Sequence, residues 1–159
     1  MCLAAQRVYG RAVRTCLTLA LCVGNGIGGN AVDELLLADT DVMVDFLRGH
    51  PKAVAFLNRN ADRIVLSSIT VAELYAGVRG EAEQEAIDAV IGVLRVAAVT
   101  GQCAKVGGLL KQRFGKSHGV GLADAIIAAT AQIEHARLCT LNVRHYPMVV
   151  GMKAAYTKA

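Results

Sequence analysis

The sequence contains no tryptophan, and only 4% of its 159 residues are aromatic. A protein that binds single-stranded nucleic acid by stacking needs an aromatic face for each of several bases, so this composition disfavours that class. No apolar run approaches the roughly 20 residues that span a bilayer, and we expect no membrane-spanning segment. With 54% hydrophobic and 19% charged residues, the chain is predicted to form a single globular domain.

Cysteines are few after residue 22: only Cys103 and Cys139 occur in the rest of the chain. No CxxC pair or Cys/His spacing of a zinc site is present, which disfavours zinc. Isolated thiols suit a packing role in a reducing compartment, and we therefore predict a cytoplasmic protein.

Acidic residues are absent from residues 1–30, which carry three arginines, a short apolar core and a Gly/Asn-rich end. This pattern imitates a secretory signal but has no A-x-A-like cleavage site. We interpret residues 1–30 as a disordered extension or a start-site artefact, and residues 31–159 as the domain.

Residues 101–159 carry a local charge of +6, which is either a footprint for a polyanion or a set of solvated helix faces.

From residue 34 onwards, short apolar runs alternate with helical periodicity. Strands are predicted at residues 35–38, 64–66, 96–99 and 138–141, with an edge strand at 148–150. Helices are predicted from residue 40 to Gly49 and at residues 51–60, 70–77, 81–94, 103–114 and 122–136. This alternation predicts a three-layer α/β/α sandwich with a mainly parallel sheet, and a ligand site beyond the carboxyl ends of its strands.

Two acids have competing interpretations. Asp39 directly follows the strand at 35–38, and is either a site residue or, like Thr40, the N-cap of the next helix. Glu73 stands three residues after Thr70, the spacing of a capping box, which competes with a role in a metal site. The residue pattern alone leaves both pairs of alternatives open.

Asp124 and Asn142 are the other candidate site residues. Asp124 shares a helical stripe with Ile127 and Ala128, so its carboxylate is predicted to project from the apolar face that packs on the sheet. A buried charge needs a partner, a shifted pKa or a metal, and this favours a functional role. Asn142 ends the strand at 138–141 and is either a turn residue or an oxygen ligand beside the acids.

The three carboxylates of Asp39, Glu73 and Asp124 are expected to meet at one edge of the sheet, where they repel one another unless a cation lies among them. Oxygen ligands without Cys or His select a hard ion, Mg²⁺ or Mn²⁺, which commonly meets phosphate. The pattern therefore predicts phosphoryl chemistry in which a metal activates a water for attack.

Four stretches in this order resemble those of PIN-domain nucleases, most closely the VapC toxins of VapBC toxin–antitoxin modules. They are residues 37–49, 68–78, 121–131 and 140–146. The resemblance implies that Asp39, Glu73 and Asp124 are the acidic metal-site residues. Asn142 stands where the wider group often has a fourth acid. Asp41 stands where the family often has Asn, and either adds charge beside the site or faces solvent.

The resemblance also implies a function: a Mg²⁺-dependent endoribonuclease, the toxin of a type II toxin–antitoxin system, acting as a homodimer with a VapB-type antitoxin as partner. We expect Thr40, Arg48 and Arg144 to contact the RNA substrate. Apolar residues of the two early helices offer either a groove for the antitoxin or only the core of the chain itself; they are Phe46, Leu47, Phe56 and Leu57. Asp45 is predicted to face solvent.

Alternative functions rest on parts of the same pattern. The Asp-x-Asp of Asp39 and Asp41 after a strand also fits haloacid-dehalogenase-like phosphatases, but the later paired-acid motif of that family is missing. A receiver-like domain needs a Lys where this chain has Asn142. A catalytically inactive PIN-like binding module is the remaining alternative, and the presence of all three central acids disfavours it.

Overall fold

The computed structural model describes residues 34–158. The predicted extension, residues 1–30, lies outside the described residues, so its boundary stays a prediction. Among the described residues, no helix combines the length and apolarity that crossing a membrane requires.

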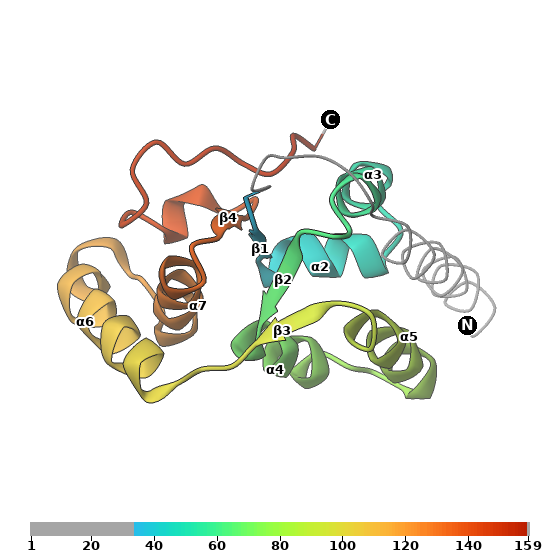
Figure 1. The fold of residues 1–159 in the computed structure, drawn as a ribbon, viewed down its shortest axis with the longest axis horizontal. Helices are drawn as coiled ribbons and strands as arrows, with labels where there is room; N and C mark the ends of the chain where they lie inside the picture. The colour runs from blue at the N-terminus through green and yellow to red at the C-terminus, as the bar shows by residue number, and fades with distance from the viewer. Residues whose placement is uncertain (1–33, 159) are drawn as a thin grey trace.

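A parallel sheet of four strands forms the centre of the described chain (Figure 1). The strands are β1 Leu36–Ala38, β2 Ile64–Ser67, β3 Arg95–Ala97 and β4 Arg137–Cys139, in the spatial order β3-β2-β1-β4. In this register, Leu37 of β1 lies opposite Val65 on one side and Leu138 on the other. The predicted parallel sheet is confirmed, and β1 lies inside it with its carboxyl end between those of β2 and β4.

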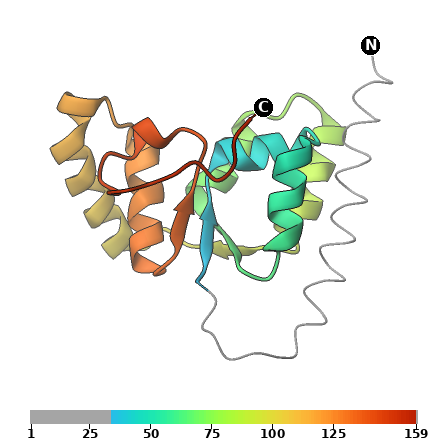
Figure 2. The same cartoon turned by 90° about the horizontal axis from the view of Figure 1, so that it is seen from above.

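Helices cover both faces of the sheet, which confirms the predicted sandwich (Figure 2). They are α2 Thr40–Leu47, α3 Pro51–Arg59, α4 Ser68–Ala76, α5 Glu81–Ile91, α6 Gly101–His118, α7 Leu122–Ile133 and the 3-10 helix η1 Val143–His145. Helices α2, α3 and α5 lie on one side, and α6 and α7 on the other. Helix α4 follows β2 directly and contacts α2, α5 and α7.

The core divides at the sheet because successive side chains of a strand point to opposite faces. Leu36 and Ala38 of β1 pack with α2, α3 and α5, whereas Leu37 packs with Ile127 and Ala128 of α7. Phe46, Leu47 and Leu57 are buried in the first of these clusters, and Phe56 is half-buried against it. Burial of Phe46 and Leu57 in this cluster supports the core interpretation for these two residues. Leu47 also lines a groove beside α4, so a groove for the antitoxin stays a prediction. Cys103 and Cys139 are buried free thiols, as a packing role requires.

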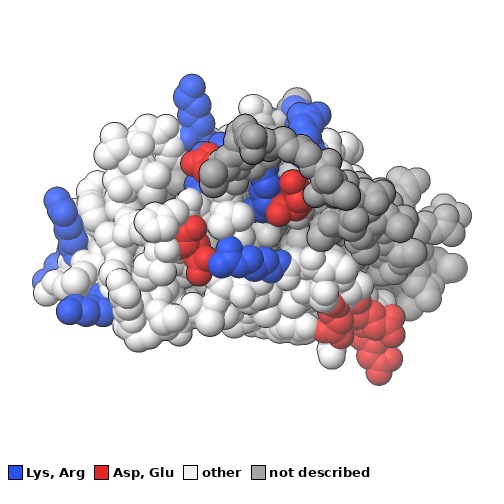
Figure 3. Space-filling model, in the orientation of Figure 1, with Lys and Arg blue, Asp and Glu red and all other residues white. Residues whose placement is uncertain are grey.

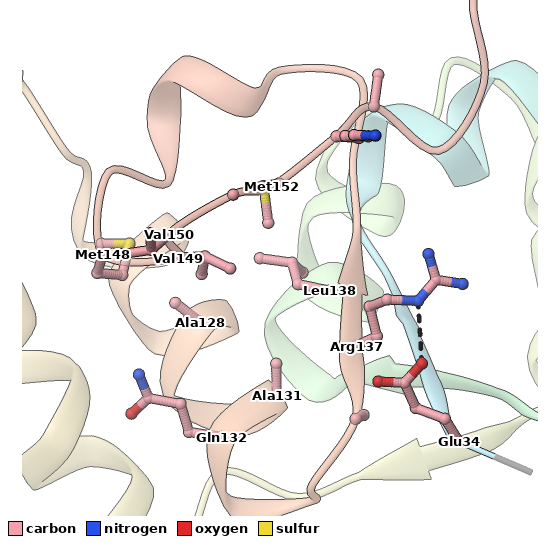
Figure 4. Close-up of a pocket in the computed structure, with 14 residues that line it drawn as sticks. Glu34, Ala128, Ala131, Gln132, Arg137, Leu138, Met148, Val149, Val150 and Met152 are labelled. Atoms are coloured by element: carbon pink, nitrogen blue, oxygen red, sulfur yellow. Dashed lines mark hydrogen bonds and ion pairs between the residues drawn. The ribbon is translucent and has the colours of Figure 1, made fainter.

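The edge strand predicted at residues 148–150 is wrong: this segment is a turn. Its side chains help to enclose a cavity of about 550 Å³ between α7, β4 and the chain after Tyr146 (Figure 4). Met148 and Met152 face Leu138 and Ala131 across it, and an ion pair between Arg137 and Glu34, 3.2 Å long, lies at its rim. The apolar residues 148–150 therefore pack around this cavity as a turn and do not pair with β4 as a strand.

Candidate functional site

A second cavity, of about 660 Å³, lies beyond the carboxyl ends of the strands, where the sequence predicted a ligand site. Its polar lining comes from the end of β1, from α2, α4, α7 and η1, and from the last described residue of the chain. The polar residues are Asp39, Thr40, Asp41, Asp45, Arg48, Glu73, Asp124, Asn142, His145 and Lys158. We call this space the acidic cavity. The structure thus brings together all four residues predicted as catalytic, together with Thr40 and Arg48.

Asp39 combines the two roles that the sequence left as alternatives. It follows β1 in an extended conformation, is the N-cap of α2, and its Oδ1 accepts a hydrogen bond of 2.8 Å from the backbone N–H of Thr40. The same carboxylate lines the acidic cavity and is only 7% exposed. Burial raises the pKa of Asp39 to about 6, and the neighbouring charge of Asp41 adds to this rise.

Glu73 does not take part in a capping box, so that alternative is wrong. Helix α4 begins at Ser68, earlier than predicted, and its N-cap is Ser67, whose hydroxyl accepts from the N–H of Ile69 at 3.2 Å. Thr70 is therefore inside the helix. The last residue of β2 is itself the cap, and the helix starts without an intervening loop. The Glu73 carboxylate accepts a hydrogen bond from the Thr40 hydroxyl instead, which joins α4 to α2.

Asp124 lies at the edge of the apolar stripe of α7 and does not project onto the sheet, in contrast to the sequence prediction. Its side chain is 26% exposed and lines the acidic cavity. Asp124 Oδ2 accepts from the backbone N–H of Gly121 at 3.2 Å and lies 3.7 Å from His145 Nδ1. The first turn of α7 extends past the sheet, so Ile127 and Ala128 pack on the strands while this carboxylate meets the cavity.

Asp41 connects α2 to the end of β4 and lines the acidic cavity, which favours the first of its two alternatives, charge beside the site. Its Oδ2 accepts hydrogen bonds from the Thr140 hydroxyl at 3.1 Å and from the Leu141 N–H at 2.9 Å. Burial raises the pKa of Asp41 above its ordinary value. These bonds hold the chain between β4 and η1 against the first turn of α2, which fixes the position of Asn142.

Asn142 both precedes a turn and lines the acidic cavity. Its backbone carbonyl accepts from the His145 N–H at 2.9 Å, and its side-chain nitrogen lies within 3.2 Å of the His145 ring nitrogens. Its Oδ1 accepts from Arg144 Nε at 3.2 Å. Arg144 itself is exposed and does not line the cavity. Sequence reasoning missed His145, although its place one helical turn after Asn142 could have indicated it.

Asp45 is buried, so the prediction that it faces solvent is wrong. It is 7% exposed, and its carboxylate accepts from the Tyr156 hydroxyl and from Lys158 Nζ, each at 2.9 Å. Burial raises the pKa of Asp45, but these hydrogen bonds outweigh that effect and the pKa lies below its ordinary value. The reason is tertiary: the last residues of the chain fold back over α2, which no local pattern around Asp45 encodes.

The acidic cavity has the oxygen donors of a hard-cation site, without a preformed cage. Within residues 34–158, no three His, Cys, Asp or Glu side chains lie close enough together to hold one ion directly. Mg²⁺ usually takes one or two carboxylates and keeps several waters, so carboxylates spread around a hydrated cavity fit that ion.

Lysine and arginine side chains are spread over one face of the molecule (Figure 3). Of the eight in residues 101–159, only Lys158 lines the acidic cavity. Whether the local charge of +6 is a footprint for a polyanion or a set of solvated helix faces stays a prediction.

Comparison with known proteins agrees with the fold and the cavity. The PIN domain family matches residues 36–147, and the chain therefore belongs to the PIN-domain family. Ribonuclease VapC19 of Mycobacterium tuberculosis is 41% identical over 124 residues, covering 76% of this chain and 98% of that protein. Ribonuclease VapC10 of the same species is 34% identical over 125 residues, covering 77% and 93%. This membership decides against the haloacid-dehalogenase-like and receiver-like alternatives.

Solved structures give the same result. A toxin–antitoxin complex from Klebsiella pneumoniae contains a chain with a TM-score of 0.65 and 26% identity, covering 76% of this chain and 98% of that one. VapBC2 from Rickettsia felis, bound to a DNA fragment from its promoter, gives a TM-score of 0.62 and 25% identity, covering 73% and 93%. The described fold is thus shared with a chain of such complexes.

Proposed function

We propose that this protein is an endoribonuclease that depends on a divalent metal and acts as the toxin of a type II toxin–antitoxin pair in the cytoplasm. The observation that carries the proposal is the convergence of Asp39, Glu73 and Asp124 on one cavity at the carboxyl ends of the strands. Similarity to proteins named ribonuclease VapC supports RNA as the substrate.

In this proposal, Asp39, Glu73 and Asp124 hold a hydrated Mg²⁺ or Mn²⁺ ion. Such an ion supplies Lewis-acid chemistry, because it acidifies a water for attack on phosphorus and neutralises charge at the leaving oxygen. The surrounding contacts fix the ligands: the Thr40 hydroxyl holds Glu73, and the N–H of Gly121 holds Asp124. Without such contacts, the carboxylates would adopt orientations unsuited to sharing an ion.

Asn142, Thr40 and Arg48 act on the substrate in this proposal. The Asn142 amide, fixed between Arg144 and His145, orients the phosphodiester without adding charge. Arg48 is exposed at the end of α2 and lines the cavity, where its guanidinium can face a phosphate. Contacts of this kind position an RNA strand and carry no sequence information.

The partners we propose are a VapB-type antitoxin, as the VapBC2 complex among the structural neighbours suggests, and a second copy of the chain, which rests on the family resemblance alone. A groove of about 320 Å³ adjoins the acidic cavity and shares Arg48 and Glu73 with it. Leu74, Val78 and Ile87 give it apolar walls. An antitoxin segment in this groove would lie beside the acids and obstruct them.

The proposal is tested with the purified full-length chain and single-stranded RNA. Cleavage is expected only with added Mg²⁺ or Mn²⁺, and Asp39→Asn is expected to abolish it without a change in melting temperature. Asp62→Asn is the control, because Asp62 is exposed and does not line the cavity. Full cleavage in excess EDTA, or full activity of Asp39→Asn, would refute the proposal.

A further inference from the structure

The last described residues of the chain cross the carboxyl ends of the strands and end beside the acidic cavity. Figures 1 and 2 show this segment running from the α7 side of the sheet over β4 to α2 and α3. We call residues 152–158 the C-terminal strap. No function predicted from the sequence used it, and the family match ends at residue 147.

Several contacts attach the strap to the domain along its length. The backbone N–H of Ala155 donates to the carbonyl of Thr140 at 2.9 Å, at the end of β4. The ring of Tyr156 stacks on that of His50, with centroids 5.9 Å apart. Lys52 Nζ then donates to the carbonyl of Thr157 at 2.7 Å. The strap therefore has a defined path, and its last residues are directed to one place.

That path places the ammonium group of Lys158 at the acidic cavity. Lys158 Nζ lies 2.8 Å from Asp45 Oδ2 and 2.9 Å from Oδ1, and the Tyr156 hydroxyl donates to Oδ2 of the same carboxylate. An ammonium group has three N–H donors, so a donor remains after the contact with Asp45. The Lys158 side chain is 54% exposed, in contrast to the 10% of Asp45, and this donor can reach a ligand in the cavity.

The charges of the acidic cavity explain why such a donor matters. Five carboxylates line it, those of Asp39, Asp41, Asp45, Glu73 and Asp124. The lysine and arginine side chains that line it are those of Arg48 and Lys158. An RNA strand is a polyanion, so it can approach the acids only where cations face its phosphates.

Arg48 and Lys158 also lie on the same side of the cavity. Arg48 comes three residues after Asp45 on α2, a spacing that puts the two on one face of the helix, and Lys158 is bound to Asp45. Together they form a basic border beside the acids. Asp39 precedes the first turn of the same helix, and Arg48 follows its last turn, so the border lies at the opposite end of α2 from Asp39.

We propose that Lys158, held in place by Asp45 and Tyr156, is a substrate-binding residue that contacts an RNA phosphate next to the one that is cut. This inference rests on the proposed nuclease function and deepens it. The C-terminal strap is then part of the binding site. Because the contact is made to a phosphate that does not react, it contributes equally to the bound substrate and to the transition state, so its loss raises KM and leaves kcat unchanged.

The test compares Lys158→Gln with Lys153→Gln in the full chain. Lys153 is the matched control, since it is an exposed lysine of the same strap that lines the other cavity. Lys158→Gln is expected to raise KM for single-stranded RNA about two- to fivefold, the range of an exposed ion pair. It should also lower the slope of log affinity against log salt by about 0.7, the value for one phosphate contact on a single strand. Lys153→Gln should leave KM and the salt slope unchanged. Lys158→Arg should keep both close to their wild-type values.

A purely structural role gives a different result. If Lys158 only neutralises the buried Asp45, Lys158→Gln lowers the melting temperature while KM and the salt slope stay as in the wild type, and the inference is overturned. Should this variant not fold, Asp45→Asn/Lys158→Gln removes the buried charge as well and is compared with Asp45→Asn alone. A rise in KM is then expected relative to Asp45→Asn, smaller than in the single variant because the charge that holds Lys158 has already been removed. Wild-type protein that never cleaves RNA contradicts the proposed function; active wild type with an unaffected Lys158→Gln contradicts only this inference.

Discussion

Two cavities of the described chain are similar in volume, about 660 and 550 Å³, but their walls differ in origin. The acidic cavity is lined by polar side chains from strand ends, from helices and from the C-terminal strap. Hydrogen bonds fix several of them, such as Asp41, Glu73 and Asp124. The cavity between α7 and β4 is lined largely by small and apolar side chains, such as Ala131 and Met152, and by a turn. Polar groups held at a cost in solvation are typical of functional sites, whereas the apolar cavity reflects how α7 and the following chain pack.

The largest effect that separates the two cavities is expected from Glu73→Gln. Because Glu73 does not cap α4 and accepts a bond from Thr40, the change should lower turnover about 100-fold, as loss of a metal-site carboxylate does. The melting temperature should stay within a few degrees of the wild type. Paired turnover and thermal-melting measurements check this, and lost stability with normal turnover would remove Glu73 from the site.

A second prediction asks whether an acid of the acidic cavity can be structural. The pKa of Asp45 is lower in the folded chain than in the unfolded chain. Ionised Asp45 therefore stabilises the fold at pH values above its unfolded pKa, near 4. That stability is lost as the pH falls through the folded pKa. Asp45→Asn should lower the free energy of unfolding at pH 7 by about 1–3 kcal/mol. Denaturant titrations of both proteins between pH 7 and pH 3 should show the difference shrinking with acid; a constant difference would contradict this account.

A third prediction concerns α7, which contributes to both cavities. A Cβ at Gly107 of α6 would lie 2.8 Å from the Ile126 side chain and 3.0 Å from its Cα, so the two helices approach closely there. Gly107→Ala should destabilise the fold by roughly 1–3 kcal/mol through overpacking. Gly108→Ala is the control, since no atom lies within 4 Å of its Cβ position. It should be neutral or stabilise by up to about 1 kcal/mol, and chemical denaturation measures both.

The smallest effect is expected from filling the apolar cavity. Ala131 is 5% exposed and lines that cavity, so Ala131→Met adds a flexible apolar side chain where there is space. Stability should rise by about 0.5–1 kcal/mol or stay constant. RNA cleavage should be unchanged. A large loss of cleavage in this variant would show that the two cavities are coupled.

Local sequence patterns predict part of the acidic cavity. The strand before Asp39 and the apolar stripe around Asp124 are local patterns, and parallel pairing alone brings the ends of such strands together. The sheet and the convergence of Asp39, Glu73, Asp124 and Asn142 on one cavity were therefore predictable. Their catalytic roles stay predictions.

The missed features depend on contacts between residues far apart in the chain. Asp45 is buried because Tyr156 and Lys158, more than 100 positions later, fold over it. The N-cap at Ser67 was missed because β2 passes directly into α4, so no loop signal separates them. The strand at 148–150 was predicted from apolar character, which packing around a cavity satisfies equally well.

The central claim is that the acids of this cavity bind a divalent metal, and a titration with Mn²⁺ tests it most directly. Free Mn²⁺ is measured by electron paramagnetic resonance, without RNA, for the wild type, for Asp39→Asn/Asp124→Asn and for the control Asp62→Asn. The account predicts saturable binding to the wild type and the control, and its loss in the double variant while the melting temperature stays close to that of the wild type. Equal binding by all three proteins would contradict it.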